Sequence, residues 1–329
     1  MPAGRLAGLG ATRDCRHGPL AMRAPEGLSL APFRAPRYWP TWFLWLFLQA
    51  VARVPLSVQM ALGRRLGPVL RRIRKRDRAV ARRNIEICFK ELSAAQRERL
   101  LERHFESVGL SLVEMGIGWF SPLDRLRRII RVEGREHLVR ALAKGRGVLL
   151  ISAHFTTLEV GVAILEDLCP RVATMYRTQR NPMMDVLIRR GRSRFASIQI
   201  PRDNVRALLR RLKENHVVAY MPDQSYLGNQ STMLPFFGEP ALTNIVTSKL
   251  ARISGATALP YFFRRLPGDS GYVVEIGAPM PDFPSGNAES DTLKFVALLE
   301  DYIRRVPEQY LWLYKKFKRR PEPYGDPYL

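Results

Sequence analysis

The sequence has few cysteines, and none of them is arranged as a metal ligand. Its 329 residues include three cysteines, Cys15, Cys88 and Cys169, which lie far apart. No CxxC pair and no Cys/His spacing typical of zinc accompanies them. We therefore expect reduced thiols in a cytosolic compartment, buried by default, and no metal site.

Acidic residues are also scarce. The chain has 30 Asp and Glu against 53 Lys and Arg, which gives a formal net charge of +23. Such an excess implies an anionic partner: nucleic acid, a phospholipid surface, a phosphorylated substrate or an acidic protein. Charge alone does not choose between them. No RNP sequence or zinc finger is present, which argues against a nucleic-acid-binding protein.

The N-terminal region has no continuous apolar stretch of the kind that a signal peptide needs, and its apolar run is by itself short for a membrane span. Residues 1–37 form a loose basic tail without a continuous apolar h-region. The apolar run 39–52 is shorter than the roughly 20 residues that a spanning helix needs. A weaker apolar stretch follows to residue 67, and ten Lys and Arg residues lie between 64 and 83.

An apolar helix beside a basic block is typical of a segment inserted among anionic lipid headgroups. We therefore expect residues 38–67 to anchor the protein to a membrane. Residues 68–329 would form a single domain on the cytoplasmic side, by the positive-inside tendency. The alternative is a core helix followed by a solvated basic face.

Helical and strand patterns alternate beyond residue 130. Helices are predicted at 93–116, 135–144, 158–168, 182–194, 204–214, 243–254 and 290–306, and strands at Val148–Ser152, Val172–Tyr176, Val217–Met221, Thr257–Phe262 and Tyr272–Ile276. This alternation predicts an α/β fold with a mainly parallel central sheet flanked by helices.

A candidate base follows the first of these predicted parallel strands. His154 ends the buried segment, and Glu159 starts the next helix. Reactive groups in open α/β sheets gather outside the carboxyl ends of the strands. A neutral imidazole can accept a hydroxyl proton, and a carboxylate can hold its other nitrogen. The acceptor hydroxyl could then attack without a serine or cysteine nucleophile.

A purely structural interpretation of the same residues is also open. Thr156 and Glu159 have the spacing of a capping box, in which Glu159 would only close the helix start. His154 could be a loop histidine with its hydrogen bonds satisfied.

The segment Ala153–Glu159 resembles the HX4(D/E) motif of the lysophospholipid acyltransferase superfamily, and the chain from about residue 38 onward is similar to its lipid A late acyltransferase branch. The supporting stretches are Ala81–Glu86, Met175–Arg177, Asn181–Pro182, Arg190–Arg192, Tyr220–Gln224, Pro235–Gly238, Pro307–Leu313 and Lys316–Pro321. Ala153 stands where glycine is frequent, and Thr178 where proline is usual. These departures leave the chemistry intact but put the identity of the acceptor in doubt.

The resemblance implies a fold like that of the glycerol-phosphate acyltransferases. It implies His154 as the general base and Glu159 as its partner. Arg177 and Asn181 are further candidates for substrate binding.

The family's other active-site arginine and aspartate fall on Arg192 and Asp223. Arg192 lies near the end of an arginine-rich predicted helix, where it would grip a phosphate or an acyl carbonyl or simply be solvated. Asp223 follows the strand predicted at Val217–Met221. Its Pro-Asp dipeptide could equally form a turn.

The resemblance further implies an acyl carrier protein thioester as donor and a phosphorylated glycolipid of the inner membrane as acceptor, with no cofactor or metal. The acidity of the carrier protein and the phosphates of the acceptor agree with the basic charge. Two alternatives are a different polar lipid acceptor or an acyl-CoA donor within the same enzyme class. A third is a non-catalytic protein that binds membranes or nucleic acid.

Overall fold

The structure is a computed structural model that describes residues 28–169, 171–196, 198–225 and 228–328. Most of the predicted basic tail, together with Cys15, lies outside these residues. Cys88 and Cys169 are free and buried, and burial raises the pKa of the Cys169 thiol to about 12. These two cysteines are therefore packing residues rather than reactive thiols.

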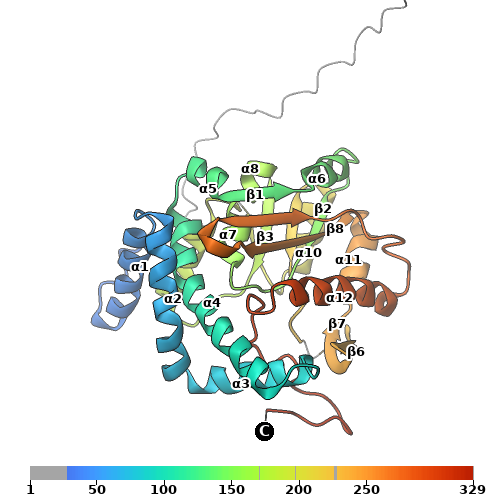
Figure 1. The fold of residues 1–329 in the computed structure, drawn as a ribbon. Helices are drawn as coiled ribbons and strands as arrows, with labels where there is room; N and C mark the ends of the chain where they lie inside the picture. The colour runs from blue at the N-terminus through green and yellow to red at the C-terminus, as the bar shows by residue number, and fades with distance from the viewer. Residues whose placement is uncertain (1–27, 170, 197, 226–227, 329) are drawn as a thin grey trace, which may run out of the picture.

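Within the described residues, one sheet has seven strands (Figure 1). Across the sheet the strands are β1 (Ile130–Glu133), β9 (Tyr272–Ile276), β8 (Thr257–Arg265), β2 (Val148–Ile151), β5 (Val217–Tyr220), β3 (Val172–Tyr176) and β4 (Ile198–Pro201). From β8 to β4 all neighbours are parallel, whereas β9 runs antiparallel to β8 and pairs in parallel with β1. The predicted α/β fold with a mainly parallel sheet is confirmed.

Helices flank this sheet, and a separate hairpin lies below α12 in Figure 1. The helices are α1 (Trp39–Val51), α2 (Leu56–Ile73), α3 (Lys75–Cys88), α4 (Ala94–Phe120), α5 (Leu123–Ile129), α6 (Arg135–Leu142), α7 (Leu158–Ala163), α8 (Leu165–Leu168), α9 (Pro182–Arg192), α10 (Val205–Lys213), α11 (Val246–Ser254) and α12 (Ala288–Arg305), with short 3₁₀ turns at Pro36–Tyr38 and Pro267–Asp269. The hairpin consists of β6 (Ser231–Phe236) and β7 (Glu239–Asn244).

The central strands read as continuous apolar runs because both of their faces are covered. All four residues of β2 are buried, and so are the first three of β5. Such runs are typical of strands in a parallel sheet with helices on both faces. The sheet core thus fixes the positions at which the chain leaves each strand.

The long helix α4 begins at a capping box. Ser93 accepts a hydrogen bond from the backbone of Gln96, whose side chain accepts one from the Ser93 backbone, so the predicted N-cap is confirmed. α4 packs closely against α2 through glycines: a Cβ at Gly109 would lie 2.3 Å from the Gly63 carbonyl oxygen and 2.6 Å from the Gly67 nitrogen. The two backbones can approach this far only because these side chains are absent.

The apolar run near the N-terminus forms α1, and the weaker stretch after it forms α2. Both helices contact α4. None of the helices in the described part of the chain combines the length and the apolar character needed to cross a membrane.

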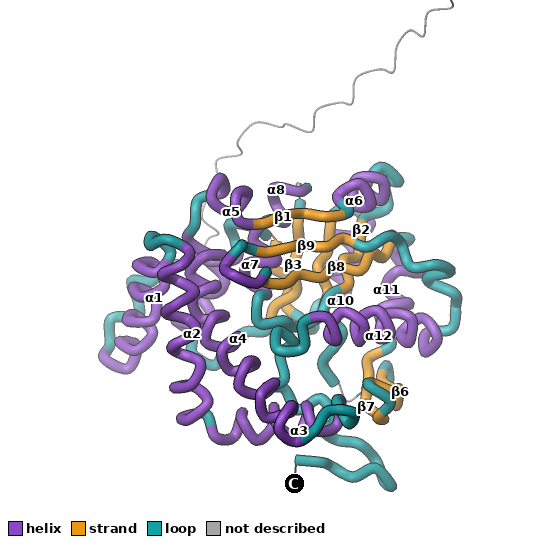
Figure 2. Tube along the Cα trace, viewed as in Figure 1, coloured by secondary structure: helices purple, strands orange, loops and turns teal. Residues whose placement is uncertain are grey.

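After α12 the chain forms no further helix or strand among the described residues and runs past α3 (Figure 2). Its first part returns to the sheet, where Tyr310 forms a β-bridge with Phe155 and the Leu311 amide donates to the His154 carbonyl oxygen at 3.0 Å. Asn84 on α3 donates from its side-chain amide to the Trp312 carbonyl oxygen at 2.7 Å. The C-terminal segment thus fastens the loop that carries the predicted base.

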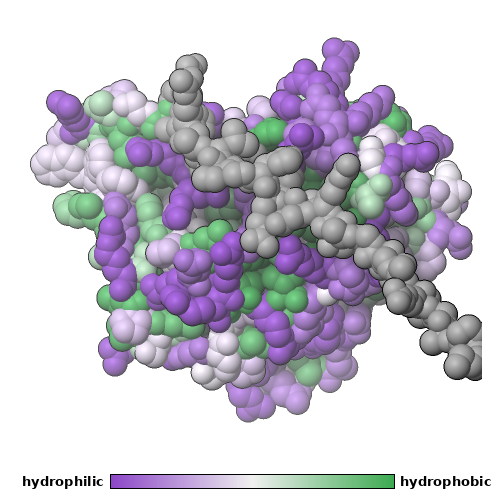
Figure 3. Space-filling view, turned by 90° about the horizontal axis from the view of Figure 1, so that it is seen from above, coloured by the Kyte–Doolittle hydropathy of each residue, from purple (hydrophilic) through white to green (hydrophobic). Residues whose placement is uncertain are grey.

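The surface over α5, α6 and α8, seen from above in Figure 3, mixes hydrophilic side chains with small hydrophobic areas. The exposed apolar side chains of α1 and α2 belong to the helical side of the molecule, on the left of Figure 1.

Candidate active site

The sheet register places His154 beside Asp223. β2 and β5 are parallel neighbours in which Ile151 lies opposite Tyr220. Each of the two candidate residues follows three positions after its strand, so both emerge at the same carboxyl edge. This is the edge at which open α/β sheets bind their ligands.

One carboxylate holds both the ring and the backbone of His154. The distance from His154 Nδ1 to Asp223 Oδ1 is 2.7 Å, and the His154 amide donates to Asp223 Oδ2 at 3.0 Å. Because an ionised carboxylate only accepts, Nδ1 carries the proton and Nε2 keeps its lone pair. Nε2 has no hydrogen-bond partner among the described residues, and His154 lines a large cavity. The histidine is therefore arranged as a base.

Asp223 also sets the pKa of this histidine. Burial lowers the pKa of His154, but the charge and the hydrogen bond of Asp223 outweigh it and raise the pKa above the ordinary value of 6.5. The pKa of Asp223 is itself lowered: burial raises it, and His154 and then Lys316 bring it down. The pair is thus built to stabilise an imidazolium beside a carboxylate.

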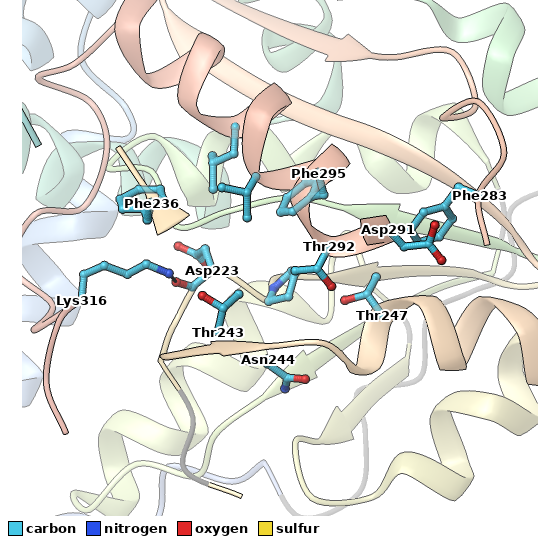
Figure 4. A pocket seen from close by; sticks show the side chains of 13 residues that line it. Asp223, Phe236, Thr243, Asn244, Thr247, Phe283, Asp291, Thr292, Phe295 and Lys316 are labelled. Carbon is cyan, nitrogen blue, oxygen red and sulfur yellow. Dashed lines mark hydrogen bonds between the residues drawn. The ribbon is translucent and has the colours of Figure 1, made fainter. Parts of the chain in front are cut away.

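Two residues of the C-terminal segment hold Asp223. The Tyr310 hydroxyl donates to Asp223 Oδ2 at 3.2 Å, and Lys316 Nζ donates to the Asp223 carbonyl oxygen at 2.8 Å. Figure 4 shows the Lys316 side chain extended towards Asp223, with Phe236 on the same side. The sequence by itself points to no role for Tyr310 or Lys316, although they lie within the stretches Pro307–Leu313 and Lys316–Pro321 that resemble the family.

The sequence predicts a contact between Glu159 and His154, but the structure shows Glu159 bound to other residues. Its carboxylate accepts a hydrogen bond from Arg192 Nε at 3.2 Å and another from Arg192 Nη2. It also accepts a hydrogen bond from Trp119 Nε1 at 2.7 Å. Its carboxylate therefore binds Arg192 and Trp119, while Asp223 occupies Nδ1 of the histidine. The expected His154–Glu159 pairing is corrected accordingly: Glu159 lies on α7, turned towards α4 and α9 rather than towards the β5 end.

The structure does not show the alternative capping box of Thr156 and Glu159 either. α7 begins at Leu158 without a side-chain cap hydrogen bond. The Thr156 hydroxyl lies 2.7 Å from Ser107 Oγ on α4 instead. Thr156 therefore ties the loop that carries His154 to α4 and forms no capping box with Glu159.

The remaining candidates fall in two different places. Arg177 and Arg192 line the same cavity as His154. Asn181 is not among the residues that line it; its side chain caps α9 by accepting from the amides of Met183 and Met184. Asn181 thus fixes the helix that carries Arg192.

The cavity at His154 has a volume of about 800 Å³, well within the range of small-molecule and lipid sites. Its lining includes the apolar residues Leu158, Val162, Phe195, Leu208, Ala219 and Leu250. The lining also includes the cationic residues Arg177, Arg192, Arg202, Lys318 and Arg319. A smaller hollow of about 20 Å³ is lined by Asp223, Phe236 and residues of α12 such as Phe295 (Figure 4). The main cavity suits an amphipathic ligand with an anionic part.

Comparison with known sequences agrees with this chemistry. The sequence model of the family described as Bacterial lipid A biosynthesis acyltransferase matches residues 30–319. The chain belongs to this family. It is therefore an acyltransferase of lipid A biosynthesis, and the expectation of an acyltransferase drawn from the sequence is confirmed.

Individual relatives in this family match over nearly their whole length. The lipid A biosynthesis palmitoleoyltransferase of Escherichia coli strain K12 is 38% identical over 298 residues, covering 88% of this chain and 94% of the relative. The lauroyltransferase of the same strain is 38% identical over 292 residues, covering 87% and 94%. The myristoyltransferase is 22% identical over 297 residues, covering 90% and 92%.

Proposed function

We propose that this lipid A biosynthesis acyltransferase moves a fatty acyl group from an acyl carrier protein thioester to a hydroxyl of a phosphorylated lipid A precursor. The observation that carries the proposal is the His154–Asp223 pair at a cavity with both apolar and cationic walls. The apolar wall suits the acyl chain. The cationic wall suits phosphate, and the net charge of +23 suits an acidic carrier protein.

In the proposed reaction, His154 Nε2 takes the proton of the acceptor hydroxyl as its oxygen attacks the thioester carbonyl. Asp223 stabilises the imidazolium that forms. The tetrahedral intermediate then collapses, the carbon–sulfur bond breaks, and the imidazolium returns the proton to the leaving thiolate. An ester and a free thiol result, and no serine or cysteine nucleophile is needed.

Arg192 is the proposed electrostatic partner of the reaction, and Glu159 is its positioning residue. Arg192 lines the cavity, and its guanidinium donates to Glu159, which in turn accepts from Trp119. A fixed cation near the carbonyl stabilises the oxyanion of the intermediate. Glu159 thereby acts on the chemistry through Arg192 rather than through His154.

We further propose that residues 38–67 anchor the enzyme in the interface of the inner membrane, with the catalytic domain, residues 68–329, on the cytoplasmic side. The exposed large apolar side chains of α1 and α2 are Trp39, Phe43, Leu46, Val58, Val69 and Ile73. Those of α1 recur at helical spacing and therefore share one face. α2 and α3 also carry exposed arginines, among them Arg65, Arg72 and Arg76, as expected for contact with anionic headgroups.

The decisive experiment offers the enzyme acyl carrier protein thioesters of several chain lengths and an incompletely acylated lipid A precursor, with mass spectrometry of the products. We expect wild type to add one acyl group. His154→Ala should lose activity by about 10²–10⁴-fold, the usual contribution of a general base. His137→Ala, a histidine on α6 outside the cavity, is the matched control.

Two outcomes would contradict the proposal. If only acyl-CoA donors supported transfer, the carrier-protein donor would be wrong. If His154→Ala kept the rate of the His137→Ala control, His154 would not be the base.

A further inference from the structure

The register of the sheet edge brings two arginines together beside the catalytic pair. β3 and β4 are parallel neighbours in which Tyr176 lies opposite Pro201. Arg177 and Arg202 are the next residues on the two strands, and the Arg202 amide donates to the Tyr176 carbonyl oxygen at 2.9 Å. Both side chains line the cavity of His154.

The C-terminal segment adds two more cations to the same wall. Lys318 Nζ lies 4.5 Å from the centre of the Tyr314 ring. The Tyr314 hydroxyl donates to the Ser225 carbonyl oxygen at 2.7 Å, two residues after Asp223. Arg319 follows Lys318 and also lines the cavity. The Tyr314 side chain therefore links Lys318 to the loop that carries Asp223. We refer to the four side chains as the cationic rim: Arg177, Arg202, Lys318 and Arg319.

The members of the cationic rim feel one another's charge. Burial raises the pKa of Tyr314 to about 12, against the opposing charges of Arg319, Arg177 and Arg202. The pKa of Lys318 is lowered, first by burial and then by its cationic neighbours. The charges of Arg177 and Arg319 thus act to lower the pKa of both Tyr314 and Lys318.

The charge of the cationic rim is poorly balanced by the protein itself. Arg202 lies 3.4 Å from Asp203, whose side chain is 85% exposed. Among the described residues, no carboxylate forms an ion pair with Arg177, Lys318 or Arg319. Like charges held together in this way favour an anion that neutralises them.

The backbone of Arg319 supports a ligand-binding role. Its φ is +59°, in the left-handed region that residues with a Cβ adopt only at a cost. Such conformations cluster at ligand sites, where the surrounding structure enforces them. The consecutive cations Lys318 and Arg319 both line the cavity.

We propose that the cationic rim is a phosphate-binding site that fixes one substrate while its reacting atom lies at His154. Arginine forks match the oxygens of a phosphate, and lysine supplies a further point charge. This inference rests on the proposed acyl transfer. The phosphate could belong to the glycolipid acceptor or to the phosphodiester arm of the thioester donor, and the chemistry of recognition is the same.

Binding is tested first without catalysis, with inorganic pyrophosphate as the probe and the thermal midpoint of the purified full-length protein as the readout. The rim variant combines Arg177→Gln, Lys318→Gln and Arg319→Gly; glycine keeps the positive φ without strain. The control variant combines Arg180→Gln, Arg206→Gln and Lys315→Gln, exposed residues that do not line the cavity. Both variants lose the same charge.

We expect pyrophosphate to raise the midpoint of wild type and of the control variant, but not that of the rim variant. An equal shift in all three proteins would overturn the proposal, because binding would then follow net charge alone. If the rim variant fails to fold, Arg177→Gln alone makes the same test at an exposed position. This result does not depend on whether the protein transfers acyl groups.

Kinetics then identify the substrate that carries the phosphate. Loss of charged hydrogen bonds to phosphate should raise one KM by about tenfold or more in the rim variant. If the acceptor is bound here, its KM rises and the difference from wild type disappears with a dephosphorylated acceptor. If the donor is bound here, its KM rises and the difference disappears with an acyl thioester of N-acetylcysteamine. Unchanged KM values for both substrates would refute the site.

Discussion

At His154, a single carboxylate fixes the tautomer, the orientation and the pKa of the ring. Asp223 accepts from Nδ1 and from the backbone of the same residue. Tyr310 and Lys316 hold Asp223 in turn. The proposed base is therefore oriented by groups that belong to the loop after β5 and to the C-terminal segment.

Asp223→Asn should show that Asp223, and not Glu159, controls the pKa of His154. The base works only when neutral, so activity falls as pH drops through the pKa of His154, which Asp223 holds above 6.5. Without the carboxylate, burial dominates and the acid limb of the pH–rate profile should move to lower pH. The maximal rate should fall by about 10³-fold or more because the tautomer is no longer fixed.

Glu159→Gln provides the comparison, since its carboxylate contacts Arg192 rather than His154. The acid limb should stay in place in this variant, whatever its rate. A shift of the limb in Glu159→Gln but not in Asp223→Asn would show that Glu159, and not Asp223, controls the base.

The Glu159–Arg192 pair should also matter for stability. Glu159→Ala leaves the guanidinium of a largely buried arginine unpaired. We expect unfolding free energy to fall by about 2–4 kcal/mol in denaturant titrations. Adding Arg192→Met should restore much of this stability without restoring activity. Full activity of the double variant would rule out Arg192 as the proposed electrostatic partner.

At the scale of elements, the crossing of α2 and α4 depends on glycines that let the two backbones touch. A side chain at Gly109 would meet backbone atoms of α2 on both sides, and neither can move without shifting the helix. α4 also carries Ser107, which contacts Thr156 in the loop after His154. It carries Trp119 as well, which donates to Glu159. Its packing therefore reaches the active site.

Gly109→Ala should lower the unfolding free energy by about 1–3 kcal/mol through overpacking. The gain in helix propensity from alanine, about 1 kcal/mol, is too small to compensate for a 2.3 Å contact. Thermal unfolding measures the effect, with Arg103→Ala on the exposed face of the same helix as control. Equal midpoints for both variants would mean that the helices separate at little cost.

At the scale of the whole molecule, two features bear on the proposed membrane attachment. They are the basic net charge and the exposed apolar side chains of α1 and α2. None of the described helices is suited to cross a bilayer. In the proposed attachment, the exposed apolar side chains of α1 and α2 lie in the acyl boundary and the arginines lie at the headgroups.

Phe43→Ser with Leu46→Ser should weaken binding to vesicles that contain anionic lipid. The two side chains are 68% and 55% exposed on one face of α1, and each loses roughly 1.5–3 kcal/mol of apolar burial in the membrane. Cosedimentation with vesicles measures the loss. Val139→Ser, at a 54% exposed position on α6, is the control. Equal binding of all proteins would exclude α1 as the contact.

Some of this organisation follows from the sequence alone. Apolar runs such as Val148–Ile151 and Val217–Tyr220 predict buried parallel strands, because only covered strands tolerate such continuity. Ser93 predicts the start of α4 because its hydroxyl satisfies an otherwise free amide. The patterns do not predict the short strand β4 or the β6–β7 hairpin. β4 forms by pairing with β3, a partner more than twenty residues earlier in the chain. The hairpin strands pair with each other across a two-residue connection.

The positions of His154, Glu159 and Asp223 at strand ends and helix starts were readable from the sequence, but their pairing was not. Glu159 lies only five positions after His154, yet the register of β2 and β5 pairs the histidine with Asp223, 69 positions away. The same holds for Arg177 and Arg202, which only the β3–β4 register makes neighbours. Local chemistry determined which residues could react, whereas tertiary structure decided which of them meet, because contacts between strands are fixed by the packing of the whole sheet.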